Sequence, residues 1–136
     1  MKFEVFETTA DVGIIAYGDT LDELFENSAL GMFSLMCNIN KVEPREKKSI
    51  KAEGDSLESL LVEWLTQLLA LRDIYGMMFS KFKARVDKEN IKVYGEAFGE
   101  ETREEHEIEV EVKAVTYHML EVSKNKVWKA KFILDI

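Results

Sequence analysis

A long apolar stripe in the middle of the chain places the strongest constraint on its fold. Hydrophobic side chains recur there at the 3.6-residue period of an α-helix, at positions Leu57, Leu60, Leu61, Trp64, Leu65, Leu68 and Leu69. Asp55 or Ser56 is expected to begin this helix as its N-cap, and Gly76 is suited to end it. After Gly76 the apolar residues change to the two-residue period of β-strands. The chain is therefore expected to pack amphipathic helices on a sheet.

An earlier helix is predicted from a capping box. Thr20 precedes Glu23 by three residues, so the threonine hydroxyl can accept a bond from the third helical N–H while Glu23 reaches back. The helix is expected to begin at Leu21 and to end near Cys37, with an apolar face of Leu21, Leu24, Phe25, Ala29, Met32, Phe33 and Met36. Gly31 within it predicts close packing against the sheet, because glycine costs a helix about 1 kcal/mol relative to alanine.

Six segments have the apolar runs or alternation of strands, and in chain order they span 3–6, 14–17, 78–86, 91–98, 107–114 and 128–135. The third and fourth are expected to form a hairpin. The last two are expected to pair as antiparallel neighbours, with Glu109 and Glu111 facing Lys129 and Lys131. The predicted fold class is α+β: a mixed, mostly antiparallel sheet with two helices packed on one face, in a single domain over residues 1–136.

Composition excludes several classes of function. Eighteen Lys and Arg against 26 Asp and Glu give a net charge of −8, so strong direct binding of nucleic acid is not expected. The acidic run at 100–107, which includes His106, is interpreted as a solvated loop. No segment has the length and apolarity of a membrane span. A single cysteine, Cys37, fits a reducing compartment, and we expect a cytoplasmic protein.

One carboxylate near the N-terminus has two interpretations. Asp11 follows two threonines and precedes Gly13, between two apolar runs, where an aspartate commonly closes a turn by accepting a backbone N–H bond. The alternative is a hard-cation site. The chain stops at Asp135 and Ile136, so an acidic side chain and the terminal carboxylate are adjacent there, and Asp11 would add a third oxygen donor.

A thiol nucleophile is a weaker candidate. Cys37 and His118 are the residue types of a thiol and its base, but Cys37 lies at the end of an apolar helix without a glycine-rich turn or basic neighbour to lower its pKa. No P-loop, dinucleotide fingerprint or His-Glu-x-x-His motif is present. The residues alone therefore indicate an acidic α+β domain with a candidate carboxylate metal site.

Several short motifs together resemble the archease family, from end to end and in the family's order. The matching segments are Thr9-Ala10-Asp11-Val12-Gly13-Ile14, Thr20-Leu21-Asp22-Glu23-Leu24-Phe25 with Ala29-x-Gly31-Met32-Phe33, Leu61-Val62-Glu63-Trp64-Leu65, Lys113-Ala114-Val115-Thr116-Tyr117-His118, and Leu134-Asp135-Ile136. The resemblance implies a non-enzymatic activator of the tRNA-splicing RNA ligase, which promotes guanylylation of the ligase and its multiple turnover. The family is also linked, as a chaperone, to a tRNA cytosine methyltransferase.

The resemblance also implies a site. The family's metal ligands fall on Asp11, Asp135 and Ile136, and the ion usually associated with them is calcium. Lys113 matches the family's lysine, which would balance these carboxylates or contact a nucleotide phosphate in the partner; the alternative is a cross-strand partner for a glutamate. The family commonly has a histidine where this chain has Thr8. A third function, a small metal-dependent hydrolase, would need a base or nucleophile beside the metal.

Overall fold

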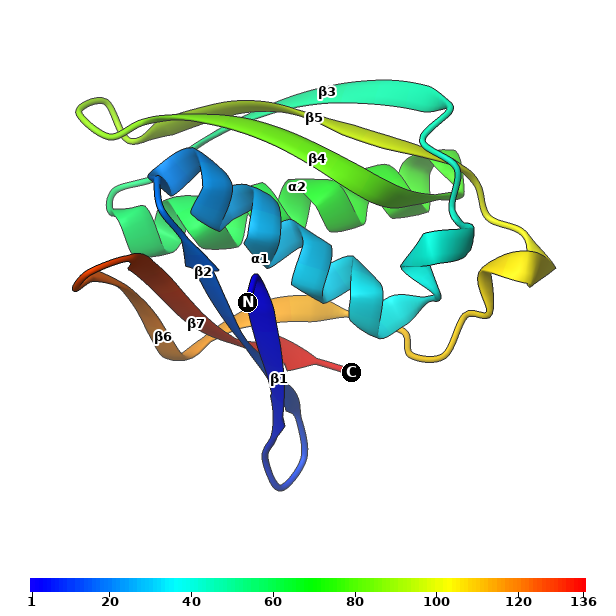
Figure 1. Ribbon diagram of the computed structural model, residues 1–136, viewed down its shortest axis with the longest axis horizontal. Coiled ribbons are helices and arrows are strands. Elements are labelled where there is room, and N and C mark those ends of the chain that lie inside the picture. Colours follow the sequence, from blue (N-terminus) through cyan, green and yellow to red (C-terminus); the bar gives the residue numbers. More distant parts are fainter.

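The computed structural model describes residues 1–136 as two helices enclosed between two antiparallel sheets (Figure 1). The helices are α1 (Leu21–Met36) and α2 (Leu57–Tyr75), and short 3₁₀ helices span Ile39–Lys41 (η1) and Glu104–His106 (η2). The four-stranded sheet has the order β1-β2-β7-β6, formed by Phe3–Glu7, Val12–Gly18, Trp128–Asp135 and Ala114–Lys124. The three-stranded sheet has the order β3-β5-β4, formed by Glu46–Glu53, Lys92–Glu101 and Met77–Asp87.

The α+β class and both predicted helices are confirmed. Thr20 caps α1 by accepting a bond from the amide of Glu23, at 3.1 Å. Ser56 rather than Asp55 caps α2, through the amide of Ser59 at 3.0 Å. Gly76 ends α2 in the left-handed conformation, at φ 61°, which a residue without Cβ adopts at little cost.

The predicted single mixed sheet is wrong in detail, because the strands divide into two sheets and every pairing is antiparallel. Helix α1 packs against β2 on one side and β4 on the other, and α2 likewise contacts β3 and β6. Gly31 and Phe33 show how α1 does this. A Cβ on Gly31 would lie 3.1 Å from a side-chain carbon of Ile14 in β2, whereas the Phe33 ring packs on two aromatic rings of β4.

The hairpin of β4 and β5 is confirmed, but the predicted strand at 107–114 is wrong. Residues 107–113 form an irregular connection, and β6 begins at Ala114. The connection does not pair along β7 but makes single hydrogen bonds to three elements. The N–H of Glu109 donates to the carbonyl of Met36 in α1 at 2.9 Å, and the guanidinium of Arg72 in α2 donates to the carbonyl of Val112 at 2.9 Å. The N–H of Lys113 donates to the carbonyl of Asp135, near the end of β7, at 2.7 Å. The predicted Glu–Lys pairs do not form, and the partners of Lys129 and Lys131 are Ser123 and Glu121.

The acidic run is only partly solvated, which corrects the predicted loop. Glu100 and His106 are 6% and 0% exposed. The Nδ1 atom of His106 accepts the Arg103 N–H at 3.1 Å, so Nε2 carries the hydrogen and donates to Glu100 at 2.9 Å. The Glu100 carboxylate also accepts the amide of Glu43 at 2.8 Å and pairs with Arg103 at 3.0 Å. The bond from the Glu43 amide, with that from His106, lowers the pKa of Glu100 from 4.5 to about 2.

Replacing Glu100 with Gln is expected to destabilise the protein at pH 7 but much less at pH 3. The folded-state pKa of Glu100 lies below its ordinary value, so its ionised form adds stability above about pH 4.5, and this contribution is lost as the pH falls toward 2. Urea denaturation of parent and variant at both pH values measures the difference. Glu104→Gln, at an exposed neighbour, is the control. An equal deficit at the two pH values would contradict the prediction.

The two helices and both sheets share one apolar core of 30 buried residues. At its centre Trp64 is fully buried and donates its indole N–H to the backbone carbonyl of Phe25, at 3.0 Å. Its ring lies over Gly95 of β5, where a Cβ would come within 2.4 Å of the indole. The structure contains no helix with the length and apolarity needed to cross a membrane.

Candidate functional site

Asp11 lies in the turn that joins β1 to β2, and its side chain does not close that turn. Thr8 closes it instead: its hydroxyl accepts the Asp11 N–H at 3.1 Å, and its own N–H donates to the Asp11 carbonyl at 3.1 Å. The Asp11 carboxylate has no hydrogen bond or salt bridge in the structure, so the turn-closing interpretation does not hold for it. Thr8 occupies the position where the family that the sequence resembles commonly has a histidine, and here it closes the turn between β1 and β2.

Asp11 and Asp135 lie just beyond the last residue pair of β2 and β7, at the same end of the sheet. The pairing of β2 with β7 reaches Val12 and Leu134, and one residue further on each strand are Asp11 and Asp135. Residues directly opposite on antiparallel strands have Cα atoms about 4.5–5.5 Å apart and point to the same face. Leu134 is buried in the core, so the alternation directs both carboxylates to the face of the sheet that points away from the helices.

Lys113 and Ile136 lie at the same end of this sheet. The Lys113 N–H donates to the Asp135 carbonyl at 2.7 Å, which brings the start of β6 beside the end of β7. The Lys113 side chain is exposed, and its amino group forms no salt bridge, so the predicted cross-strand pair with a glutamate is absent. Ile136, 38% exposed, follows Asp135 as the last residue of the sequence.

The donor atoms at this end of the sheet suit calcium or another hard divalent cation, but the side chains are too few to surround the ion completely. Carboxylate oxygens are among the ligands that such ions prefer, and the Asp11 carboxylate has no hydrogen bond that would compete with a cation. However, no group of three or more His, Cys, Asp or Glu side chains able to hold a metal occurs in the structure. Asp11 and Asp135 would therefore supply two ligands, with the carboxylate of Ile136 as the third.

Cys37 and His118 do not form a catalytic pair. Cys37 is buried at the end of α1, and burial raises the pKa of its thiol to about 11, which opposes formation of the nucleophilic thiolate. His118 is exposed on β6.

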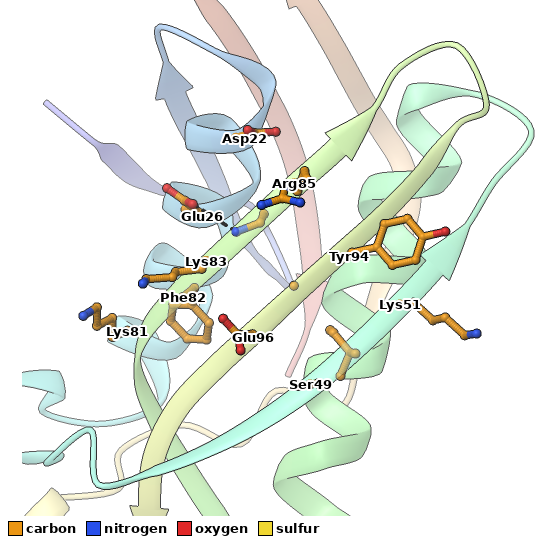
Figure 2. Close-up of a pocket in the computed structure, with 13 residues that line it drawn as sticks. Asp22, Glu26, Ser49, Lys51, Lys81, Phe82, Lys83, Arg85, Tyr94 and Glu96 are labelled. Carbon is orange, nitrogen blue, oxygen red and sulfur yellow. Dashed lines mark hydrogen bonds between the residues drawn. The ribbon is translucent and has the colours of Figure 1, made fainter.

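A second candidate site is a groove of about 990 Å³ over the three-stranded sheet. Figure 2 shows Lys51 of β3 and Arg85 of β4 on either side of Tyr94 of β5, and Lys81 and Lys83 further along β4. Asp22 and Glu26 of α1 lie at one side of the groove. The sequence reasoning missed this site because it did not predict β3. The alternation of Lys81, Lys83 and Arg85 within 78–86 was the available signal.

The two acids at the side of this groove are bound to the backbone. Asp22 accepts the amide of Val86 at 2.7 Å, and Glu26, one helical turn later, accepts the amide of Ala84 at 3.0 Å. Partial burial raises the pKa of Glu26, and the negative charges of Asp22 and Glu23 add to the rise. These bonds satisfy N–H groups on the free edge of β4, which protects that edge from pairing with another chain.

Comparison with known proteins identifies relatives along the whole chain. The model of the Archease protein family matches residues 3–136. "Protein archease" of Sulfurisphaera tokodaii is 43% identical over 137 residues, covering 99% of each chain, and "Protein archease" of Pyrococcus abyssi is 41% identical over 140 residues, also covering 99% of each. The solution structure of Methanobacterium thermoautotrophicum Protein 1598 is similar with a TM-score of 0.86 and 43% identity, covering 98% of each chain.

Proposed function

Because this chain belongs to the archease family, we propose that it is a cytoplasmic, non-enzymatic activator of the tRNA-splicing RNA ligase. In this proposal it promotes guanylylation of the ligase and so allows multiple turnovers. The single observation that supports the proposal is that the motif residues Asp11, Asp135, Ile136 and Lys113 lie at the same end of the four-stranded sheet.

The chemistry of these residues suits assistance to phosphoryl transfer. Transfer of a nucleotidyl group depends mainly on positioning and on compensation of negative charge. A bound divalent cation, calcium in this proposal, would supply positive charge at this end of the sheet. Asp11, Asp135 and the carboxylate of Ile136 would hold it, and the exposed amino group of Lys113 would contact a phosphate in the active site of the ligase.

The surface is compatible with docking on a basic, RNA-binding enzyme. The net charge of −8 favours encounter with a positively charged partner. Strand β6, at the edge of the sheet that carries the motif residues, departs from regular pairing between Thr116 and Glu121. This irregularity exposes Tyr117 and Met119 at 62% and 49%, and Met119 has a positive φ of 56°. Tyrosine and methionine are enriched in protein interfaces relative to the rest of the surface.

The experiment that tests the proposal is a guanylylation assay with the purified ligase. We expect this protein, added in excess with calcium present, to increase both the rate of ligase–guanylate formation and the number of RNA joining events per ligase. Bovine serum albumin at equal concentration controls for non-specific stabilisation of the ligase. An unchanged guanylylation rate at saturating protein would overturn the proposal. Hydrolysis of a phosphodiester by this protein alone would favour the hydrolase instead.

A further inference from the structure

We propose that the outer face of the β3-β5-β4 sheet binds a short segment of single-stranded RNA. This inference concerns the groove rather than the motif end of the other sheet, and it goes beyond the proposed activation of the ligase. The ligand chemistry is that of a polyanion with flat aromatic bases. The arrangement of charged and aromatic side chains in rows across the sheet supports the proposal.

The first row places an exposed aromatic ring between two cations. Tyr94 lies on the central strand β5, opposite Lys51 of β3 and Arg85 of β4, and Figure 2 shows the three side chains across the sheet. The Tyr94 side chain has no hydrogen bond, and the residue is 51% exposed. Neither Lys51 nor Arg85 has a salt bridge. Neighbouring strands lie about 4.8 Å apart, so the row presents one cation on each side of the aromatic residue.

The second row repeats the pattern further along the sheet. Phe98 of β5 lies opposite Lys47 of β3 and Lys81 of β4. The Lys81 amino group is 5.3 Å from the centre of the Phe98 ring, and Lys47 forms a salt bridge at 3.1 Å with Glu96. Glu96 belongs to the row between the two aromatic rows and is the single acid in these three rows.

A β-bulge orients the cations of β4. The pairing shifts between Phe79, opposite Gly99, and Lys81, opposite Phe98, so one extra residue, Ser80, is inserted. After the bulge, Phe82 and Ala84 face the core, and Lys81, Lys83 and Arg85 all point outward. Lys83 forms no salt bridge either. Its amino group is 5.8 Å from the centre of the Phe98 ring. The acids Asp22 and Glu26 lie beyond the edge of β4 and are bonded to its amides.

Single-stranded RNA uses both features of this face, whereas an acidic protein segment uses only the charge. Proteins that bind single strands combine a positive groove for the phosphates with aromatic rings on which bases stack, and sheets with exposed aromatic residues are one common form. The net charge of −8 belongs to the whole chain, while counterion release depends on the cations in contact with phosphates. We therefore expect binding that is measurable at low salt and weak at physiological salt.

The test is a fluorescence-anisotropy titration of a labelled oligouridylate octamer with the full chain, without the ligase, at several salt concentrations. With four phosphates contacted, the logarithm of affinity should fall against the logarithm of salt with a slope of about −3. Tyr94→Ala should weaken binding about fivefold or more, because stacking is lost, while Tyr94→Phe retains it. Lys83→Gln should reduce the steepness of the slope by about 0.7. Lys126→Gln, in the exposed turn between β6 and β7, is the matched control.

Three outcomes would overturn the proposal. One is no binding of the octamer at 50 mM salt. Another is binding that is insensitive to both Tyr94→Ala and Lys83→Gln, which would locate it elsewhere on the chain. The last is that polyglutamate carrying the same total charge displaces the octamer and that Tyr94→Ala does not weaken binding of the octamer. This result would indicate an acidic protein partner. Circular dichroism of every variant ensures that a loss of binding is read only from folded protein.

Discussion

Replacing Asp11 or Asp135 with alanine is expected to abolish ligase activation while leaving the protein folded. The Asp11 carboxylate makes no hydrogen bond, and the turn that contains it is closed by Thr8, so removal of the carboxylate leaves those bonds in place. In metal-free buffer the two carboxylates at neighbouring strand ends repel one another. The melting temperature of each variant should therefore be unchanged or raised when no metal is present.

Calcium provides a readout that does not depend on the ligase. A ligand that binds only the folded state stabilises it by about 2.7 kcal/mol at 100 times its dissociation constant. Added calcium should raise the melting temperature of the parent but not that of either aspartate variant. Glu89→Ala, at an exposed residue in the turn between β4 and β5, should behave as the parent does in both assays.

Two results would contradict this prediction. If both aspartate variants activate the ligase as well as the parent, these carboxylates are not needed for the proposed function. If calcium stabilises parent and variants equally, it binds at another place. A third result is possible: the variants lose activation, but calcium does not stabilise the parent. In that case the two aspartates contact the ligase directly, and the cation is removed from the proposal.

The largest effect on stability is expected for Trp64→Ala, at about 3–5 kcal/mol. Trp64 is fully buried at the centre of the core, donates to Phe25 C=O and packs over Gly95. Gly95 has no side chain that could fill the resulting space. For a domain of this size the melting temperature should fall by about 10–20 °C, which differential scanning calorimetry measures directly.

Trp64→Phe separates packing from hydrogen bonding. Phenylalanine retains an aromatic ring but not the indole N–H that donates to Phe25, so its loss of stability should lie clearly below that of alanine. Trp128→Ala is a comparison at a half-buried tryptophan and should cost less than Trp64→Ala. If Trp64→Ala costs less than about 1 kcal/mol, the core does not depend on this ring as described.

Local patterns predicted the helices because helix formation depends on near neighbours in sequence. The Thr20 N-cap, the apolar stripe from Leu57 to Leu69 and the glycine at 76 each act within a few residues, and the structure confirms all three. The second bond of the predicted capping box, from Glu23 back to Thr20, does not form. The strand prediction at 107–114 failed because the contacts of this segment are with residues far away in the sequence. Alternation there resembles a strand, but the segment bonds to the carbonyl of Met36 and the guanidinium of Arg72, which are distant in sequence.

The sequence alone determined the fold class, the two helices, the hairpin of β4 and β5 and the candidate residues at both chain ends, because caps, turn chemistry and hydrophobic period are local properties. Only the tertiary structure decided what these residues meet. The pairing of β2 with β7 placed Asp11 and Asp135 at the same end of one sheet. Glu100 and His106, predicted to lie in a solvated loop, are buried and hydrogen-bonded to each other. The pairing of β3, β5 and β4 aligned cations in rows on an acidic protein. Strand register and burial depend on contacts between distant segments, so a one-dimensional pattern leaves them open.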